Sequence, residues 1–110
     1  MTAKQENQNR FKSTVFHALS DPIRLEIVTY LRDGEKCVCE IVPHLNLIQP
    51  LVSRHLKILK DAGIVRCRKD GTKRMYSIVD SGIFNVVDAL TLALVHSLTK
   101  EVFENITCSQ

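Results

Sequence analysis

The residues of this chain that are best suited to chemistry are two cysteines one position apart, Cys37 and Cys39. A thiolate is a soft ligand for thiophilic ions and is also the reactive form of cysteine in redox chemistry. At the start of a helix the backbone dipole favours the thiolate, which would prime both sulfurs. Residues two positions apart do not share a helical face, so the sulfurs can share one ion only if the helix start is irregular or opens on binding. The alternative is that both cysteines are small core residues.

A basic segment follows the cysteines. Residues 54–74 contain eight Lys or Arg and two Asp, a balance of +6, whereas the rest of the chain has seven basic and ten acidic residues, a balance of −3. Such asymmetry is typical of a face that binds a polyanion. The segment begins in a predicted helix from about Gln49 to Gly63, with Pro50 at its front and the glycine at its end.

This helix has an apolar side, formed by Ile48, Val52, Leu56 and Leu59, and a polar side that suits nucleic acid. Amide, hydroxyl and guanidinium groups near the front of a recognition helix read bases, and lysines further along contact phosphates. His55 lies at the border, where it either donates to a phosphate or packs as a structural histidine. The alternative for the whole polar side is a solvated charged face. The predicted DNA contacts of the helix are Gln49, Ser53, Arg54, His55, Lys57 and Lys60.

Two strand-like runs, residues 64–69 and 72–78, are separated by Asp70-Gly71, which is a strong hairpin signal. In the alternating pattern Val65 and Cys67 are expected to face inward, and the arginines between and after them outward. Hairpin cations reach phosphates or the minor groove, and each phosphate contact adds about −0.9 to the slope of log affinity against log salt. The hairpin residues predicted to contact DNA are Arg68, Lys69, Lys73 and Arg74.

The remaining elements would position these residues within a single domain over residues 1–110, with a flexible arm over about 1–8 and a flexible tail over about 104–110. A first helix runs to about Leu19. A second begins after Asp21, a capping residue followed by proline, and ends at Gly34. A short third helix begins near Cys37 to Cys39, with Pro43 tolerable if it lies in the first turn. The order predicts a mainly α fold with a small β-hairpin, the winged helix-turn-helix.

The last helix, from about Ser81 past Leu98, is apolar on almost every side, and such a helix must be buried all round. We expect a twofold homodimer formed through the first and last helices, which would set two recognition helices about 34 Å apart on DNA. The alternative is a helix buried centrally in a monomer. The predicted dimer interface consists of Phe11, Val15, Phe84, Val87, Leu90 and Leu94.

Four stretches in this order resemble the ArsR/SmtB family of metal-sensing repressors: residues 16–25, 37–41, 53–56 and 75–77, within a match over about 11–79. The resemblance implies a dimeric winged helix-turn-helix repressor that binds double-stranded operator DNA and dissociates when a metal, metalloid or oxidant binds. It implies arsenite or antimonite, or cadmium or lead, as inducer at Cys37 and Cys39, and hence a role in arsenic or metal resistance.

The chain departs from the family pattern at three places. Related arsenic sensors carry a third cysteine three positions after the second, where this chain has Val42. Because arsenite and antimonite prefer three thiolates, we take Cys108 as the candidate third ligand, with a spectator in a mobile tail as the alternative. Zinc is less favoured, because the histidine and carboxylate pattern of zinc members is absent around Asp80 and His96. Ile48 stands where a capping Ser or Thr is common, which leaves the docking pose of the recognition helix open.

A thiol-redox or persulfide-responsive repressor using the same cysteines is the alternative function. The four cysteines are expected to be thiols. On oxidation, Cys37 or Cys39 would pair with Cys108 or with each other, and pairing with Cys108 is favoured because a Cys-x-Cys bridge is strained. We do not expect an enzyme, because the sequence lacks three motifs of catalytic sites: a Cys-x-x-Cys on a strand–helix turn, a glycine-rich phosphate loop, and a paired acid and base. We also expect that no cofactor is required. Without 18 consecutive apolar residues or an apolar signal core, we expect no membrane partner and a cytoplasmic location.

Overall fold

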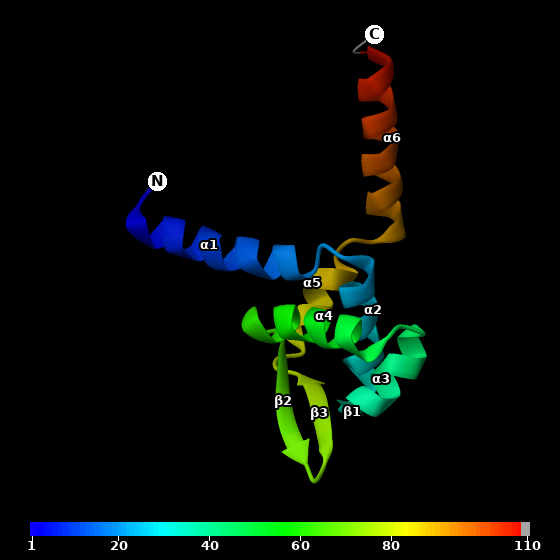
Figure 1. Ribbon diagram of the computed structural model, residues 1–110. Coiled ribbons are helices and arrows are strands. Elements are labelled where there is room, and N and C mark those ends of the chain that lie inside the picture. Colours follow the sequence, from blue (N-terminus) through cyan, green and yellow to red (C-terminus); the bar gives the residue numbers. More distant parts are fainter. Residues whose placement is uncertain (109–110) are drawn as a thin grey trace. The chain divides into compact units, whose positions relative to one another are not determined.

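The computed structural model describes residues 1–108 and divides the chain into two compact units, residues 1–80 and the residues from Ser81 onward. Among the described residues the first unit holds four α-helices, a short 3-10 helix and three strands, and the second holds two helices (Figure 1). The elements of the first unit are α1 (Ala3–Ala18), α2 (Pro22–Tyr30), η1 (Leu31–Asp33), β1 (Lys36–Cys37), α3 (Val38–Leu45), α4 (Gln49–Asp61), β2 (Val65–Asp70) and β3 (Lys73–Ile78). The second unit consists of α5 (Gly82–Asp88) and α6 (Leu92–Cys108). The mainly helical winged helix-turn-helix predicted from the sequence is confirmed.

The core of the first unit lies where α2, α3 and α4 pack against one another. The side chains with the least exposure come from these helices and from the start of β2, and burying each stabilises the fold by about 1.5–3 kcal/mol. They are Ile27, Val28, Ile41, Val52, Leu56, Leu59 and Val65. Ile48, which the sequence placed on the apolar stripe, is instead 70% exposed, because it is the residue before α4 and has left the helical path.

Capping explains where α2 and α3 begin and end. Asp21 accepts hydrogen bonds from the backbone N–H groups of Ile23 and Arg24, as predicted for a capping residue before proline. Asn46 ends α3 in the left-handed conformation, with φ 54°, and the chain turns there into α4. Pro43 lies beyond the first turn of α3, contrary to the expectation; in so short a helix its missing N–H removes only a late bond of the ladder.

The wing is an antiparallel hairpin of β2 and β3 that extends from the end of α4 (Figure 1). Asp70 pairs with Lys73, so the two turn residues are Gly71 and Thr72, one position later than the sequence suggested. Gly71 has φ 63°, which a two-residue hairpin turn requires and glycine adopts without strain. A strand that the sequence did not reveal, β1, pairs with the other edge of β3, with Cys37 opposite Met75.

The N-terminal segment is helical rather than an arm, because Thr2 and Gln5 form a capping box at the start of α1. The predicted flexible tail over 104–110 is helical as far as Cys108; residues 109 and 110 lie outside the described residues.

The second unit contains two helices where one long helix was predicted. They differ in direction by 45°, and α6 begins after Thr91, whose side-chain oxygen accepts from the N–H of Leu94. This local cap competes with continuation of α5, which explains the break without proline or glycine. Among residues 1–108 no single helix is long and apolar enough to cross a membrane, although α5 and α6 taken together meet that test by length and composition.

Candidate nucleic-acid interface and thiol site

The polar side of α4 is exposed along its length. Its apolar residues pack against the other helices, which leaves an amide, a hydroxyl, a guanidinium and two ammonium groups on the outer face. These exposed residues are Gln49, Ser53, Arg54, Lys57 and Lys60. Lys57 donates to the Asp61 carboxylate at 2.8 Å, one turn along the helix, so part of its charge is compensated within α4.

His55 is a structural residue of the core. Its side chain is 8% exposed, and its Nδ1 lies 3.1 Å from Nη1 of Arg24, which is also buried. A guanidinium only donates, so Nδ1 of His55 must accept and the ring proton of the neutral imidazole lies on Nε2. Arg24 also donates to the carbonyl of Ala18 at 2.6 Å. The sequence allowed His55 either to donate to a DNA phosphate or to pack as a structural histidine. Its burial and its contact with Arg24 favour the packed histidine, so His55 is not part of the proposed DNA surface.

Arg68, in the wing, is held by a carboxylate that sequence reasoning missed. Its Nε and Nη2 donate to the two carboxylate oxygens of Glu35 at 2.8 and 2.6 Å. The hydrogen bond from Arg68 lowers the pKa of Glu35 below its ordinary value, and Glu35 raises the pKa of Arg68 in turn. This fork-to-fork pair ties β2 to the segment just before β1. The pair was hidden because its two residues are 33 positions apart, and because Glu35 precedes β1 whereas Arg68 lies in β2, on the other side of β3 in the sheet.

The other wing cations are exposed around the hairpin turn. Lys69 is the residue before the last in β2, and Lys73 and Arg74 begin β3. Val65 is buried, Cys67 is half-buried, and Arg66 and Arg68 are exposed, so the predicted alternation along β2 is confirmed. Burial raises the pKa of the Tyr76 hydroxyl, and a hydrogen bond with Cys67 on the facing strand raises it further. Cys67 therefore belongs to the interior of the wing, as expected.

A groove of about 690 Å³ lies between the start of α3, the outer face of α4 and the wing. It brings together most of the residues that the sequence assigned to two separate tasks, the thiol pair and the DNA contacts. Its lining residues are Cys37, Val38, Cys39, Val42, Pro43, Gln49, Ser53, Lys57, Lys60, Thr72, Lys73, Arg74 and Tyr76. Four of these are cations and none is a carboxylate.

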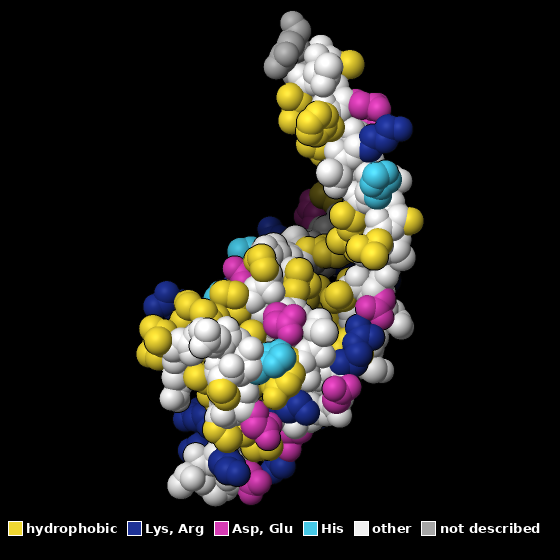
Figure 2. Space-filling view, turned by 90° about the vertical axis from the view of Figure 1, so that its right-hand side faces the viewer, with side chains coloured by type: hydrophobic (Ala, Val, Ile, Leu, Met, Phe, Trp, Pro, Cys, Tyr) yellow, Lys and Arg dark blue, Asp and Glu magenta, His cyan; other side chains and the backbone are white. Residues whose placement is uncertain are grey.

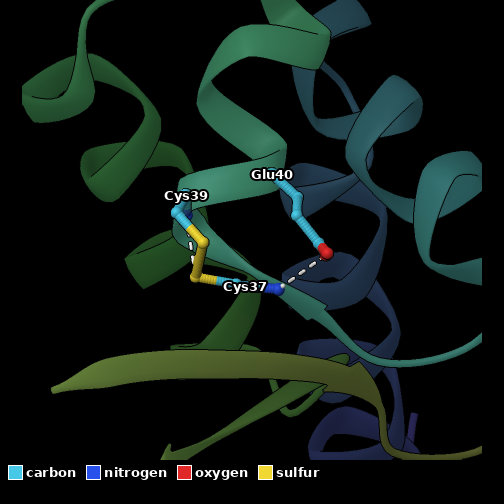
Figure 3. Close-up of a disulfide and its surroundings, with 3 residues drawn as sticks. All are labelled: Cys37, Cys39 and Glu40. Atoms are coloured by element: carbon cyan, nitrogen blue, oxygen red, sulfur yellow. Dashed lines mark hydrogen bonds between the residues drawn. A yellow bond between two sulfur atoms is a disulfide. The ribbon is translucent and has the colours of Figure 1, made fainter.

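Cys37 and Cys39 line this groove, and their sulfurs form a disulfide (Figure 3). Cys37 is the residue before α3 and has an extended backbone, whereas Cys39 is in the first helical turn. The change of direction between them brings the side chains together, which is the irregular helix start that the sequence required. The Cys37 sulfur accepts from the N–H of Cys39 at 3.0 Å, and the Cys37 N–H donates to Oε2 of Glu40 at 3.1 Å, which closes a capping box.

This bond corrects the expectation that all four cysteines are thiols and that a bridge would preferably involve Cys108. Cys67 and Cys108 are the free cysteines, Cys108 being exposed at the end of α6. Within residues 1–108, no group of three or more His, Cys, Asp or Glu side chains is arranged to hold a metal ion. Cys108 as third ligand therefore stays a prediction.

Of the six predicted dimer residues, three are exposed (Phe11, Leu90 and Leu94) and three are half-buried in the isolated chain. On α1, Phe11 is 77% exposed and Val15 half-buried. In the second unit, Phe84 and Val87 of α5 are half-buried, and α6 has no buried residue at all. Figure 2 shows hydrophobic side chains on the surface of α6, the segment that ends in the grey residues, and the exposed large ones are Leu92, Leu94, Val95, Leu98, Val102, Phe103 and Ile106.

Known proteins are similar to this chain both in sequence and in fold. The family described as "Bacterial regulatory protein, arsR family" matches residues 21–66. An arsenical resistance operon repressor from Staphylococcus aureus is 38% identical over 80 residues, which cover 73% of this chain and 77% of that protein. The transcriptional repressor SmtB from Mycobacterium tuberculosis is 42% identical over 73 residues, but the match covers 66% of this chain and only 54% of that repressor.

Among solved structures, a homodimeric winged helix-turn-helix DNA-binding domain from Mycobacterium bovis, described as a possible ArsR-family regulator, has a TM-score of 0.73. It is 26% identical in sequence, and the match covers 96% of this chain and 93% of that one.

Proposed function

Because this chain belongs to the arsR family of bacterial regulatory proteins, we propose that it is a transcriptional repressor, a homodimer that binds operator DNA and releases it when a thiophilic metalloid or metal binds Cys37 and Cys39. The observation that carries this proposal is the groove in which the two sulfurs adjoin the basic faces of α4 and the wing. We propose the cytoplasm as its location, where a bacterial regulator meets its operator.

The proposed DNA surface is the outer face of α4 together with the wing. Gln49, Ser53 and Arg54 at the front of α4 are exposed and would read base edges in the major groove. Lys60, Lys73 and Arg74 would contact phosphates on either side. Arg68 acts differently from the other wing cations, because its guanidinium is engaged by Glu35 and sets the position of the wing.

The proposed dimer buries the apolar residues that the isolated chain exposes. α6 leaves seven large hydrophobic side chains at least 41% exposed, and α1 leaves Phe11 and Phe16 exposed. A monomer rarely exposes so many large hydrophobic side chains along one helix, as α6 does, unless that helix is an interaction site. The homodimeric state of the structural relative from Mycobacterium bovis supports the same assembly.

The thiol pair suits a soft ion once the disulfide is reduced. Cys37 and Cys39 then supply two converging thiolates, and the N–H of Cys39 at the Cys37 sulfur favours the ionised form there. Arsenite or antimonite prefers a third thiolate, for which Cys108 remains the proposed source, from either copy in the dimer; cadmium or lead would use the same sulfurs. The arsenical resistance repressor among the relatives supports this inducer class.

The protein would release the operator if the inducing ion and the DNA each require a different conformation of the groove. Cys39 lines the same groove as Ser53, Lys57 and Lys73. An ion that reshapes the start of α3 would therefore disturb the surface that holds the DNA backbone. The coupling needed is about 1–3 kcal/mol, a 5- to 150-fold change in affinity.

The experiment is operator binding by fluorescence anisotropy of the reduced protein, with arsenite or cadmium added, in wild type and in Cys37→Ser, Cys39→Ser and Cys108→Ser. We expect arsenite to release the wild type and not the first two variants. Cys67→Ser is the matched control, because Cys67 lies in the wing interior facing Tyr76 and should leave the response intact. Release that persists in both Cys37→Ser and Cys39→Ser would overturn the assigned inducer site.

A second candidate is a thiol-redox or persulfide-responsive repressor, which the Cys37–Cys39 disulfide favours. In that case oxidation alone, without any metal, would change operator affinity. The same anisotropy assay, run with an oxidant or a persulfide donor and reversed by a reductant, distinguishes it. Release by an oxidant with no response to arsenite or cadmium would select the redox function over the metalloid function.

A further inference from the structure

We propose that the oxidised protein captures a low-molecular-weight anionic thiol as a mixed disulfide on Cys39, with the groove between α3, α4 and the wing holding the anionic part. The cysteine pair would then have two roles: as a disulfide it reacts preferentially with anionic thiols, and as two thiols it binds the inducing ion. The effect on DNA binding rests on the proposed function, whereas the capture itself does not.

The two sulfurs of the disulfide differ in access. Cys37 is 4% exposed and is enclosed by β1 and the start of α3. Cys39 belongs to the first turn of α3 and is exposed on the groove. Figure 3 shows the bond joining Cys37, at the end of the strand, to Cys39, in the first turn of the helix. Both residues line the groove, but the much greater exposure of Cys39 makes its sulfur the more accessible to an incoming thiolate.

The exchange needs no added oxidant. The thiolate of the small molecule attacks the Cys39 sulfur, a new sulfur–sulfur bond forms to it, and the Cys37–Cys39 bond breaks. Cys37 leaves with the electron pair as a thiolate and then takes a proton from water. The leaving thiolate is stabilised where it forms, because the Cys39 N–H points at the Cys37 sulfur at 3.0 Å and the sulfur lies at the start of α3. The reverse attack by Cys37 restores the disulfide and frees the small thiol.

The lining of the groove selects the charge of the captured thiol. Lys57, Lys60, Lys73 and Arg74 face it and no Asp or Glu does. At about 690 Å³ the groove has the size of an ordinary small-molecule site. Cations near the sulfur attract a carboxylate-bearing thiol and also favour its thiolate form. The ligand class is therefore a small thiol or thiol peptide that carries two or more carboxylates.

Capture would oppose DNA binding in two ways, given the proposed function. The adduct would occupy the groove lined by Ser53 and Lys60, and its carboxylates would neutralise cations that DNA phosphates need. The repressor would then respond to the state of the thiol pool and not to metals alone.

The test uses the full chain, oxidised so that the Cys37–Cys39 disulfide is formed, and no DNA. Mercaptosuccinate, 2-mercaptoethanol and cysteamine serve as dianionic, neutral and cationic probes. Acid-quenched samples are analysed by intact mass and peptide mapping, and each rate of disulfide loss is divided by the rate of the same thiol with a small uncharged disulfide. We expect mercaptosuccinate to react about tenfold faster than cysteamine after this correction, equivalent to about 1.4 kcal/mol, with the adduct on Cys39.

Two variants test whether the cations of the groove cause the preference for the anionic thiol. Lys60→Gln combined with Lys73→Gln should reduce the tenfold preference to less than about threefold, whereas Lys4→Gln, on α1 and outside the groove, should leave it unchanged. Equal corrected rates for the three probes, an adduct on Cys37, or a chain that forms no Cys37–Cys39 disulfide on oxidation would each overturn the proposal. The capture assay contains no DNA, so its result does not depend on whether the protein binds an operator. Charge-selective capture that leaves operator affinity unchanged would overturn only the proposed effect of capture on DNA binding.

Discussion

Neutralising Lys73 tests the proposed DNA surface at a single charge. Lys73 begins β3 next to the hairpin turn, is exposed, and lines the groove opposite α4. Each phosphate contact contributes about −0.9 to the slope of log affinity against log salt concentration. A homodimer presents Lys73 twice, so Lys73→Gln should make the slope less steep by about 1.8.

The assay is fluorescence anisotropy of a labelled operator over a series of KCl concentrations. On each doubling of salt the variant should lose about 3.5-fold less affinity than the wild type. Lys4→Gln carries the same change in net charge on α1, away from the groove, and should keep the wild-type slope. A wild-type slope in Lys73→Gln would refute the phosphate assignment, and an equal change in both variants would mean that only net charge matters.

Three further outcomes are expected. Arg24→Met should lower the free energy of unfolding by about 2–6 kcal/mol in urea titrations, because the buried Ala18 carbonyl and His55 Nδ1 each lose their donor at about 1–3 kcal/mol; a loss below 1 kcal/mol would contradict the network. Desolvation raises the pKa of Asp21, but hydrogen bonds from Ile23 and Arg24 outweigh it and hold the pKa below its ordinary value of 3.8. The ionised carboxylate therefore stabilises the fold above pH 3.8, and this stabilisation is lost as pH falls through the lower pKa of the folded state. Asp21→Asn has no such carboxylate, so on acidification below about pH 4 the variant should lose less stability than the wild type does, as measured by thermal unfolding across pH. Leu94→Glu should convert the dimer to monomer in sedimentation velocity, and a dimer that persists at micromolar concentration would argue against an interface through α6.

The parts of the fold that the sequence predicted are those with strong local signals. Asp21-Pro22 begins α2, the alternation from Val65 onward gives β2, and a glycine stands in the turn of the wing. Each of these rests on the backbone preference of one or two residues, which tertiary contacts do not override here.

The features that were missed depend on contacts distant in sequence or on a choice between two local patterns. β1 has two residues and exists only through its pairing with β3, so no periodicity could reveal it. The break before α6 depends on the cap that Thr91 supplies, in a run of residues that also fits one continuous helix. Hydrophobicity alone could not distinguish the two.

The sequence predicted the thiol pair and the DNA contacts as two separate sites, and the structure places residues of both along one groove. The charges of α4 and the wing were evident from spacing, as were Cys37 and Cys39. That both lie along one groove depends on how the start of α3 faces β3, which the sequence does not encode locally. The charge type of His55 and Arg68 suggested DNA contacts, which remain predictions, whereas their partners Arg24 and Glu35 are distant in sequence and were not evident from it.

The most direct test of the central claim is the mutual effect of inducer and operator on one reduced homodimer. Arsenite affinity is measured by equilibrium dialysis with the protein free and with the protein saturated by operator DNA. Because binding free energies are reciprocally linked, the operator should weaken arsenite binding by the same factor, about 5- to 150-fold, by which arsenite weakens operator binding. Equal arsenite affinity in the free and DNA-bound protein would contradict the account.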